Sequence, residues 1–196
     1  EMNPEMQKQL CGNFCVVIHV DGTSEVKIVE EGNTVFNKAK EIIGCRFIDH
    51  VMVQSIVPKS RDMIEFLVND EGYMDWGNDP AKVNQIATMI YSRGNKPDHY
   101  ILGDVVMCLM VDGDEGGDFV GMSYGFATSI AKQNNEELRQ KAQELCPRPD
   151  AVPMPKVTIS SYDSTEDMMR AIRGDKSVKP SSETVRSSGK DAPADA

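Results

Sequence analysis

The polar stretch from Asp70 to Asn84 gathers hydrogen-bonding and aromatic side chains that could bind a ligand. It contains Trp76, the single tryptophan of the chain, and it lies between the end of an apolar strand and the start of a helix. Free N–H groups at a helix N-terminus attract anions, and an aromatic ring beside them can stack on a base. A strand end, a helix start and a turn can converge on one side of a sheet, so we expect a small-molecule site there. The ligand-binding residues that we expect are Tyr73, Trp76, Asn78, Asn84, Gly103 and Asp104.

The same stretch also has a purely structural interpretation. Trp76 would close the edge of the core, and Asn78 or Asp79 would only cap a helix. A deep pocket beside Trp76 would favour ligand binding, whereas an open acidic surface would favour a protein partner.

The acidic run DGDEGGD at 112–118 first suggests a calcium loop, because hard cations prefer clustered carboxylates. The EF-hand pattern fails here, since Gly116 stands at the fifth ligand position and Ser123 stands where the bidentate glutamate belongs. We therefore expect a hairpin turn. Cys11, Cys15 and His19 are four residues apart, which suits a helix, but 14–20 has the pattern of a strand, so no metal site is expected.

Neither a catalytic set nor a cofactor is predicted. The chain lacks the G-x-S-x-G, P-loop, G-x-G-x-x-G and H-E-x-x-H patterns. His50 and His99 have no partner signature, and we expect each to be a surface or satisfied core histidine. An odd number of cysteines without a C-x-x-C pair, and with Cys108 inside an apolar strand, predicts reduced thiols and a cytoplasmic location.

The hydrophobic periodicity predicts a single α+β domain with a mixed or antiparallel sheet, in the order hairpin-α-β-β-α-β-β-α. FCVVIHV (14–20) and EVKIV (25–29) flank Asp21-Gly22 as a hairpin, and a helix over 34–43 is capped by Asn33. The expected strands are 46–57, 62–68, 104–111 and 118–123, with 62–68 central, and the expected helices lie within 78–94 and 124–145.

Composition divides the chain into an N-terminal arm (1–9), the α+β domain (10–146), a linker with marginal structure (147–175) and a disordered tail (176–196). The linker holds KVTIS, a candidate short strand, and STEDMMRAIRG, a candidate short helix. The tail has almost no large apolar residue, so it cannot bury enough surface to offset the entropy of ordering.

The net charge of the chain limits the classes of binding partner that we expect. The net charge is −10, and 1–146 carries all of it, because 147–196 is balanced. An acidic surface repels phosphate backbones, so direct nucleic-acid binding is not expected, although a local basic pocket for a small anion remains open. The charge either keeps the protein soluble or competes for a basic partner. The chain contains no apolar stretch of about 18 residues, so we expect no membrane span. The polar segment EMNPEMQKQL does not have the pattern of a signal peptide. A homo-oligomer remains possible as an expectation from the sequence.

A resemblance to a known family rests on the order of several short motifs. A helix ending in IIG (42–44) is followed by a long strand, DEG (70–72), N-x-x-A-T-x-x-Y (84–91) and ILGDVV (101–106). This order resembles an uncharacterised bacterial and phage family, domain of unknown function 3846, over about 33–123. The resemblance implies a small α+β domain carried by phages, plasmids and their hosts, with no established activity. The link YMDWGNDPAKV is longer and more polar than the one typical of the family.

These observations together favour a non-catalytic binding protein of a phage or mobile element. Its sharper form is a counter-defence protein that sequesters a nucleotide-like host immune signal. The alternatives are an acidic protein–protein inhibitor of a basic host protein and a structural or accessory protein of the phage particle.

Overall fold

A computed structural model describes most of the chain: residues 3–56, 59, 61–77, 79–113, 116–150, 152, 156–162, 164–172, 177 and 179–187. The chain forms two compact units, Glu1–Val152 and Pro153–Ala196. The first unit contains the predicted domain over 10–146 and extends beyond both of its ends.

The first unit is built on one antiparallel sheet, so the predicted α+β class is confirmed. The strand order is β1-β7-β2-β6-β5-β4, and β3 pairs with β2. The predicted central position of 62–68 is confirmed, because β5 lies between β4 and β6. The strands are β1 (Cys11–Gly12), β2 (Phe14–Ile18), β3 (Ser24–Ile28), β4 (Ile48–Ser55), β5 (Met63–Asn69), β6 (Val105–Gly113) and β7 (Gly116–Met122).

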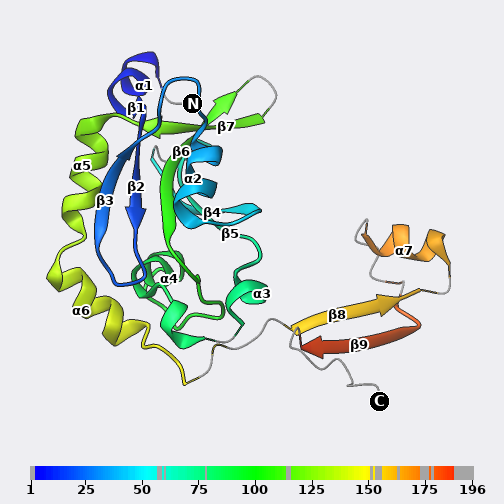
Figure 1. Ribbon diagram of the computed structural model, residues 1–196. Coiled ribbons are helices and arrows are strands. Elements are labelled where there is room, and N and C mark those ends of the chain that lie inside the picture. Colours follow the sequence, from blue (N-terminus) through cyan, green and yellow to red (C-terminus); the bar gives the residue numbers. More distant parts are fainter. Residues whose placement is uncertain are drawn as a thin grey trace. The chain divides into compact units, whose positions relative to one another are not determined.

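Helices cover both faces of this sheet (Figure 1). One face packs against α2, while α4 and α5 lie on the other and α6 packs on α4. The helices are α1 (Pro4–Leu10), α2 (Val35–Ile43), α3 (Gly72–Trp76), α4 (Gln85–Tyr91), α5 (Tyr124–Gln133) and α6 (Glu136–Leu145), with a 3₁₀ turn at Pro80–Lys82.

The alternation of side chains along β2 shows why two layers of helices are needed. Successive side chains of a strand point to opposite faces, so Val16 and Ile18 enter the core under α4 and α5, while Cys15 and Val17 enter the core under α2. All four are buried. A sheet that is apolar on both faces must be covered on both faces.

The helix predicted within 78–94 is wrong as a single element. The structure has two elements in this range, the 3₁₀ turn capped by Asp79 and α4 capped by Asn84, and α3 ends before it. The break falls at Val83, whose backbone is extended and forms a β-bridge with Leu102. Pairing with a distant segment overrides the helical pattern at this position.

Two smaller corrections concern helix ends. The helix predicted over 124–145 is two helices, because Asn135 caps α6 through the N–H of Leu138. Thr34 caps α2 where Asn33 was expected, and Gly44 ends it in the left-handed region as predicted (φ +72°). The N-terminal arm contains α1, which the sequence analysis did not predict.

The described residues of the second unit form a two-stranded antiparallel sheet and one helix. KVTIS lies in β8 (Lys156–Ser161), and the predicted short helix is α7 (Thr165–Ile172). Within the predicted disordered tail, Ser182–Ser187 forms β9, which pairs with β8, whereas 188–196 lies outside the described residues. In the part of the chain that the structure describes, no helix is long and apolar enough to cross a membrane.

Candidate functional site

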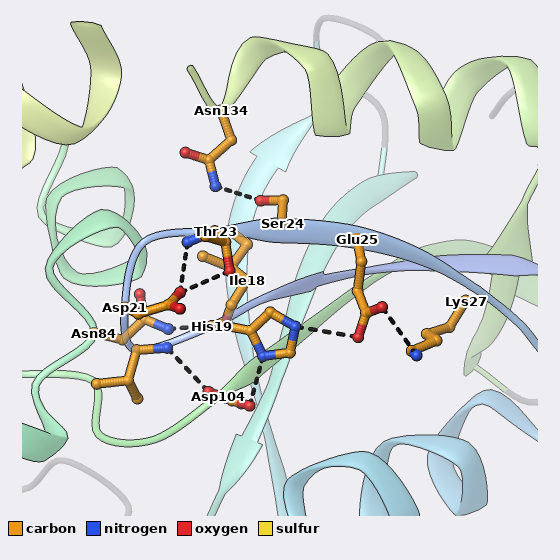
Figure 2. A network of polar contacts seen from close by, with 11 residues as sticks. Ile18, His19, Asp21, Thr23, Ser24, Glu25, Lys27, Asn84, Asp104 and Asn134 are labelled. Carbon is orange, nitrogen blue, oxygen red and sulfur yellow. Dashed lines mark hydrogen bonds and ion pairs between the residues drawn. The ribbon is translucent and has the colours of Figure 1, made fainter. Parts of the chain in front are cut away.

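A network of polar contacts lies at the turn end of the β2–β3 hairpin (Figure 2). His19 is at its centre: Nδ1 is 2.8 Å from Oδ2 of Asp104, and Nε2 is 3.1 Å from Oε1 of Glu25. The other oxygen of Asp104 accepts from the N–H of Val20 at 2.9 Å, and Lys27 pairs with Glu25 at 2.9 Å. The network joins the start of β6 to the hairpin although 85 residues separate His19 from Asp104.

This environment favours the charged form of the His19 imidazole. Burial opposes the charged ring, but the hydrogen bond and charge of Asp104, followed by those of Glu25, outweigh it and raise the pKa of His19 above its ordinary value. Both ring nitrogens face carboxylate oxygens, so each can donate a proton in a hydrogen bond. A ring held in this way braces the hairpin and is poorly placed to accept a proton from a substrate.

Asn84 is the structural anchor beside this network. Its side chain is fully buried, and Nδ2 donates to the carbonyl oxygens of Ile18 at 2.9 Å and Gly103 at 3.1 Å. Oδ1 accepts from the N–H of Ala87 and so caps α4. All of these bonds are internal, so the polar atoms of Asn84 are already engaged.

Trp76 packs against the backbone of the Gly103 turn. A Cβ placed on Gly103 would lie 2.3 Å from Cη2 of Trp76, and φ of Gly103 is +81°, so both contact and backbone require glycine. The ring also lies near Gly72, and the ammonium of Lys82 is 5.7 Å from its centre. These contacts agree with the structural interpretation, in which Trp76 closes the edge of the core.

The structure brings four of the six predicted residues into direct or neighbouring contact: Trp76, Asn84, Gly103 and Asp104. Tyr73 lies on the same short helix as Trp76, and its hydroxyl contacts the backbone of Tyr100. Asn78 lies outside the described residues.

A pocket of about 360 Å³ opens between the sheet and the helices α4, α5 and α6. We call it the sheet–helix pocket. Its lining is mostly branched aliphatic, with methionine, hydroxyl and amide groups and no charged residue: Val16, Ile18, Ser24, Val53, Gln54, Ile64, Ile86, Ile90, Met107, Ile130, Gln133, Asn134 and Leu138.

Asn134 carries the unusual feature of this pocket. Asn134 lies at the end of α5, and its Nδ2 contacts the hydroxyl of Ser24 on β3, as Figure 2 shows. Its Oδ1 is buried and has no hydrogen-bond partner. A buried carbonyl oxygen without a partner is costly, and such groups are rare in folded proteins. Asn134 therefore offers a free acceptor next to an apolar pocket.

The remaining reactive groups point to structural roles. Burial raises the pKa of the Cys15 thiol to about 11 and that of Cys108 further, so neither is activated as a nucleophile. Glu65 is buried beneath His50, whose Nδ1 is 3.3 Å from Oε2, and burial raises the pKa of Glu65. No group of three His, Cys, Asp or Glu side chains among the described residues could hold a metal ion.

His19, Glu25 and Asn134 were not predicted to take part in these polar contacts. Nothing in the local pattern marks them, because their partners are distant: Asn134 and Ser24 are 110 residues apart. The strand order, with β2 between β3 and β6, brings Glu25 and Asp104 to His19.

Comparison with protein-family models, with curated proteins and with solved structures finds no match for the chain. The fold and the two features described above are thus the basis for a functional proposal.

Proposed function

We propose that this chain is a non-catalytic binding protein that holds a small molecule in the sheet–helix pocket. The observation that carries the proposal is the unpartnered Oδ1 of Asn134 beside an uncharged pocket of about 360 Å³. Binding pockets for small molecules are concave, mostly apolar and about 300–1,000 Å³ in volume, with a few polar groups that fix orientation.

The lining indicates the chemistry of the ligand. Since no charged side chain lines the pocket, the part of the ligand inside it is neutral, because an unpaired charge there would be costly. The aliphatic walls suit a flat or compact ring, and Asn134 requires an N–H or O–H donor on its edge. The side chains of Gln54 and Gln133 can bond further polar atoms of the ring.

A nucleobase has this combination of a flat apolar face and hydrogen-bonding edges. A nucleotide-like ligand would place its base in the pocket and keep its phosphates outside, because the lining offers no cation to them. This form of the proposal moves the expected ligand away from Trp76, whose ring is packed on Gly103.

The hydrogen bonds of His19 and the burial of the cysteine thiols support binding without catalysis. His19 is engaged on both ring nitrogens, and the pKa values of the Cys15 and Cys108 thiols are raised. A protein of this kind acts by lowering the free concentration of its ligand. For a phage or mobile element in a bacterial cytoplasm, the setting implied by the family resemblance, sequestration of a host signal is the role that we propose.

Isothermal titration calorimetry with the full chain tests the proposal. The probes are adenine, adenosine, guanosine, cyclic mononucleotides and dinucleotides, and ADP-ribose. We expect at least one to bind with a dissociation constant below about 100 µM, and Asn134→Ala to weaken it roughly five- to ten-fold through loss of one hydrogen bond.

Two further variants separate pocket binding from surface binding. Ile130→Trp fills the pocket and should abolish binding, whereas Gln140→Ala, on an exposed part of α6, should leave it unchanged. Melting curves verify that each variant is folded. The proposal fails if no probe binds below about 1 mM, or if Ile130→Trp, once shown to be folded, binds as the parent does.

A further inference from the structure

A second cavity, of about 230 Å³, lies beside α3, where the ends of β4 and β5 meet the loop that follows α4. We call it the tyrosine pocket. Three tyrosine rings, a histidine and two aspartates are among the residues that line it: Tyr73, Tyr91, Tyr100, His99, Asp49 and Asp70. The sheet–helix pocket shares none of its lining residues.

Hydrogen bonds hold the rim of the tyrosine pocket in place. The hydroxyl of Tyr73 donates to the carbonyl of Tyr100 at 3.0 Å and accepts from its N–H at 3.1 Å. On the sheet side, the amide of Asn69 accepts from the N–H of Glu71 at 2.9 Å and donates to Asp75 at 2.7 Å. The helix, the loop and the strand end are therefore fixed relative to one another without a ligand.

The charge of the pocket is one-sided. Asp49 and Asp70 are exposed carboxylates of its lining, which includes no lysine or arginine. The faces of aromatic rings carry negative electrostatic potential, so tyrosines attract a cation that lies over them. Asp49, Asp70 and the three rings thus all favour the same kind of group, a cation on an apolar stem.

The size of the cavity limits the cation to one side chain. About 230 Å³ is smaller than the usual range for whole small-molecule ligands, about 300–1,000 Å³, but a single long side chain fits. Exposed apolar residues lie on the neighbouring elements, among them Met74 on α3 and Phe47 just before β4. They could support the backbone of a larger partner around that side chain.

We propose that the tyrosine pocket receives a lysine or arginine side chain of a basic partner protein. The net charge of −10 would steer such a partner toward this chain, and the pocket would then select the protruding cation. This interaction does not depend on ligand binding in the sheet–helix pocket. It gives a physical location to the inhibitor of a basic protein that the sequence left as an alternative.

The test measures binding of cationic probes to the full chain at about 150 mM salt. The probes are a lysine-rich and an arginine-rich decapeptide, a glutamate-rich control peptide, and tetramethylammonium as a free cation without a peptide. We expect one basic peptide to bind at least about ten-fold more tightly than tetramethylammonium, and the acidic peptide not to bind.

Matched variants distinguish the pocket from the overall charge. Asp70→Asn removes one lining charge, and Glu137→Gln removes one charge from exposed α6. We expect Asp70→Asn to weaken the peptide roughly five-fold or more, because Asp70 would lie directly beside the bound cation. Glu137→Gln should change binding less than two-fold, because Glu137 does not line the pocket and acts only through a long-range field that salt screens. Tyr91→Leu keeps apolar bulk but loses the aromatic face, and it should weaken binding by a similar factor to Asp70→Asn.

Three outcomes would overturn the inference. Equal effects of Asp70→Asn and Glu137→Gln would assign binding to net charge alone. Tetramethylammonium that binds as tightly as the peptides would indicate a small free cation as the ligand. No binding of either basic peptide below about 1 mM would remove the pocket as a docking site.

Discussion

Replacing Asn84 by alanine tests whether this buried amide holds three segments together. The substitution removes the cap of α4, at a cost of about 1 kcal/mol, and two buried donors to the carbonyls of Ile18 and Gly103. Each lost bond adds about 1 kcal/mol or more, since it leaves a buried carbonyl without this partner. The expected loss is about 3–4 kcal/mol, a large part of the stability of an ordinary domain, about 5–15 kcal/mol.

The matched control is Asn135→Ala. Asn135 caps α6 through the N–H of Leu138 in the same way, but it is exposed and makes no comparable long-range bond. It should therefore cost only about 1 kcal/mol. The difference between the two variants, about 2–3 kcal/mol, isolates the bonds of Asn84 to the β2 end and the Gly103 turn.

Urea unfolding followed by tryptophan fluorescence measures both variants. Trp76 is the only tryptophan and lies on Gly103, so its signal reports on the first unit. With a slope of about 2 kcal/mol per molar urea, Asn84→Ala should lower the midpoint by about 1.5–2 M and Asn135→Ala by about 0.5 M. Equal shifts would refute the view that Asn84 connects the hairpin, α4 and the turn.

Three further predictions concern pH, the second unit and the thiols. The pKa of His19 is raised in the folded state, so the stability that its ion pairs add is complete below about pH 6.5 and is lost as pH rises through the folded pKa. The urea midpoint of the parent should therefore exceed that of His19→Gln by more at about pH 6 than at about pH 9. A difference that grows with pH would contradict the ion pairs. Truncation after Pro155 should leave the melting temperature of the first unit nearly unchanged. Truncation after Asp150 also removes the buried Val152 and should lower the melting temperature by about 5 °C in calorimetry. A large decrease after the first truncation would mean that 156–196 stabilises the first unit. Cys108 should react with a thiol reagent only in denaturant, and rapid labelling of native protein at this position would contradict its place in the core.

Six of the seven strands in the sheet of the first unit, all except β1, could be predicted from sequence because their signals are local. The hairpin at β2–β3, the central β5 and the pair β6–β7 all follow from apolar alternation and turn residues. The strand order could not be predicted, since sequence does not show that β2 pairs with β6.

Two of the errors have a common cause in contacts between distant residues, whereas the cap residues Thr34 and Asn135 act locally. The helix predicted within 78–94 is interrupted because Val83 pairs with Leu102. The local hydrophobic pattern of 78–94 gives no information about that distant partner. Asn84 and the Gly103 turn, both predicted as ligand-binding residues, are joined by an internal hydrogen bond, whereas His19, which reaches Asp104 through the strand order, was not among the predicted residues.

The pairing of the first strands with the last ones also sets the order in which the protein can form during synthesis. The β2–β3 hairpin leaves the ribosome before β6 and β7, which are complete only about 85–95 residues after the end of β3, a delay of about 4–19 seconds at about 5–20 residues per second. Until then the apolar residues of β2 have no neighbouring strand on the β6 side. Glu25 and Lys27 place charged side chains on β3 of the hairpin, and such charges oppose pairing with other chains before β6 and β7 are made.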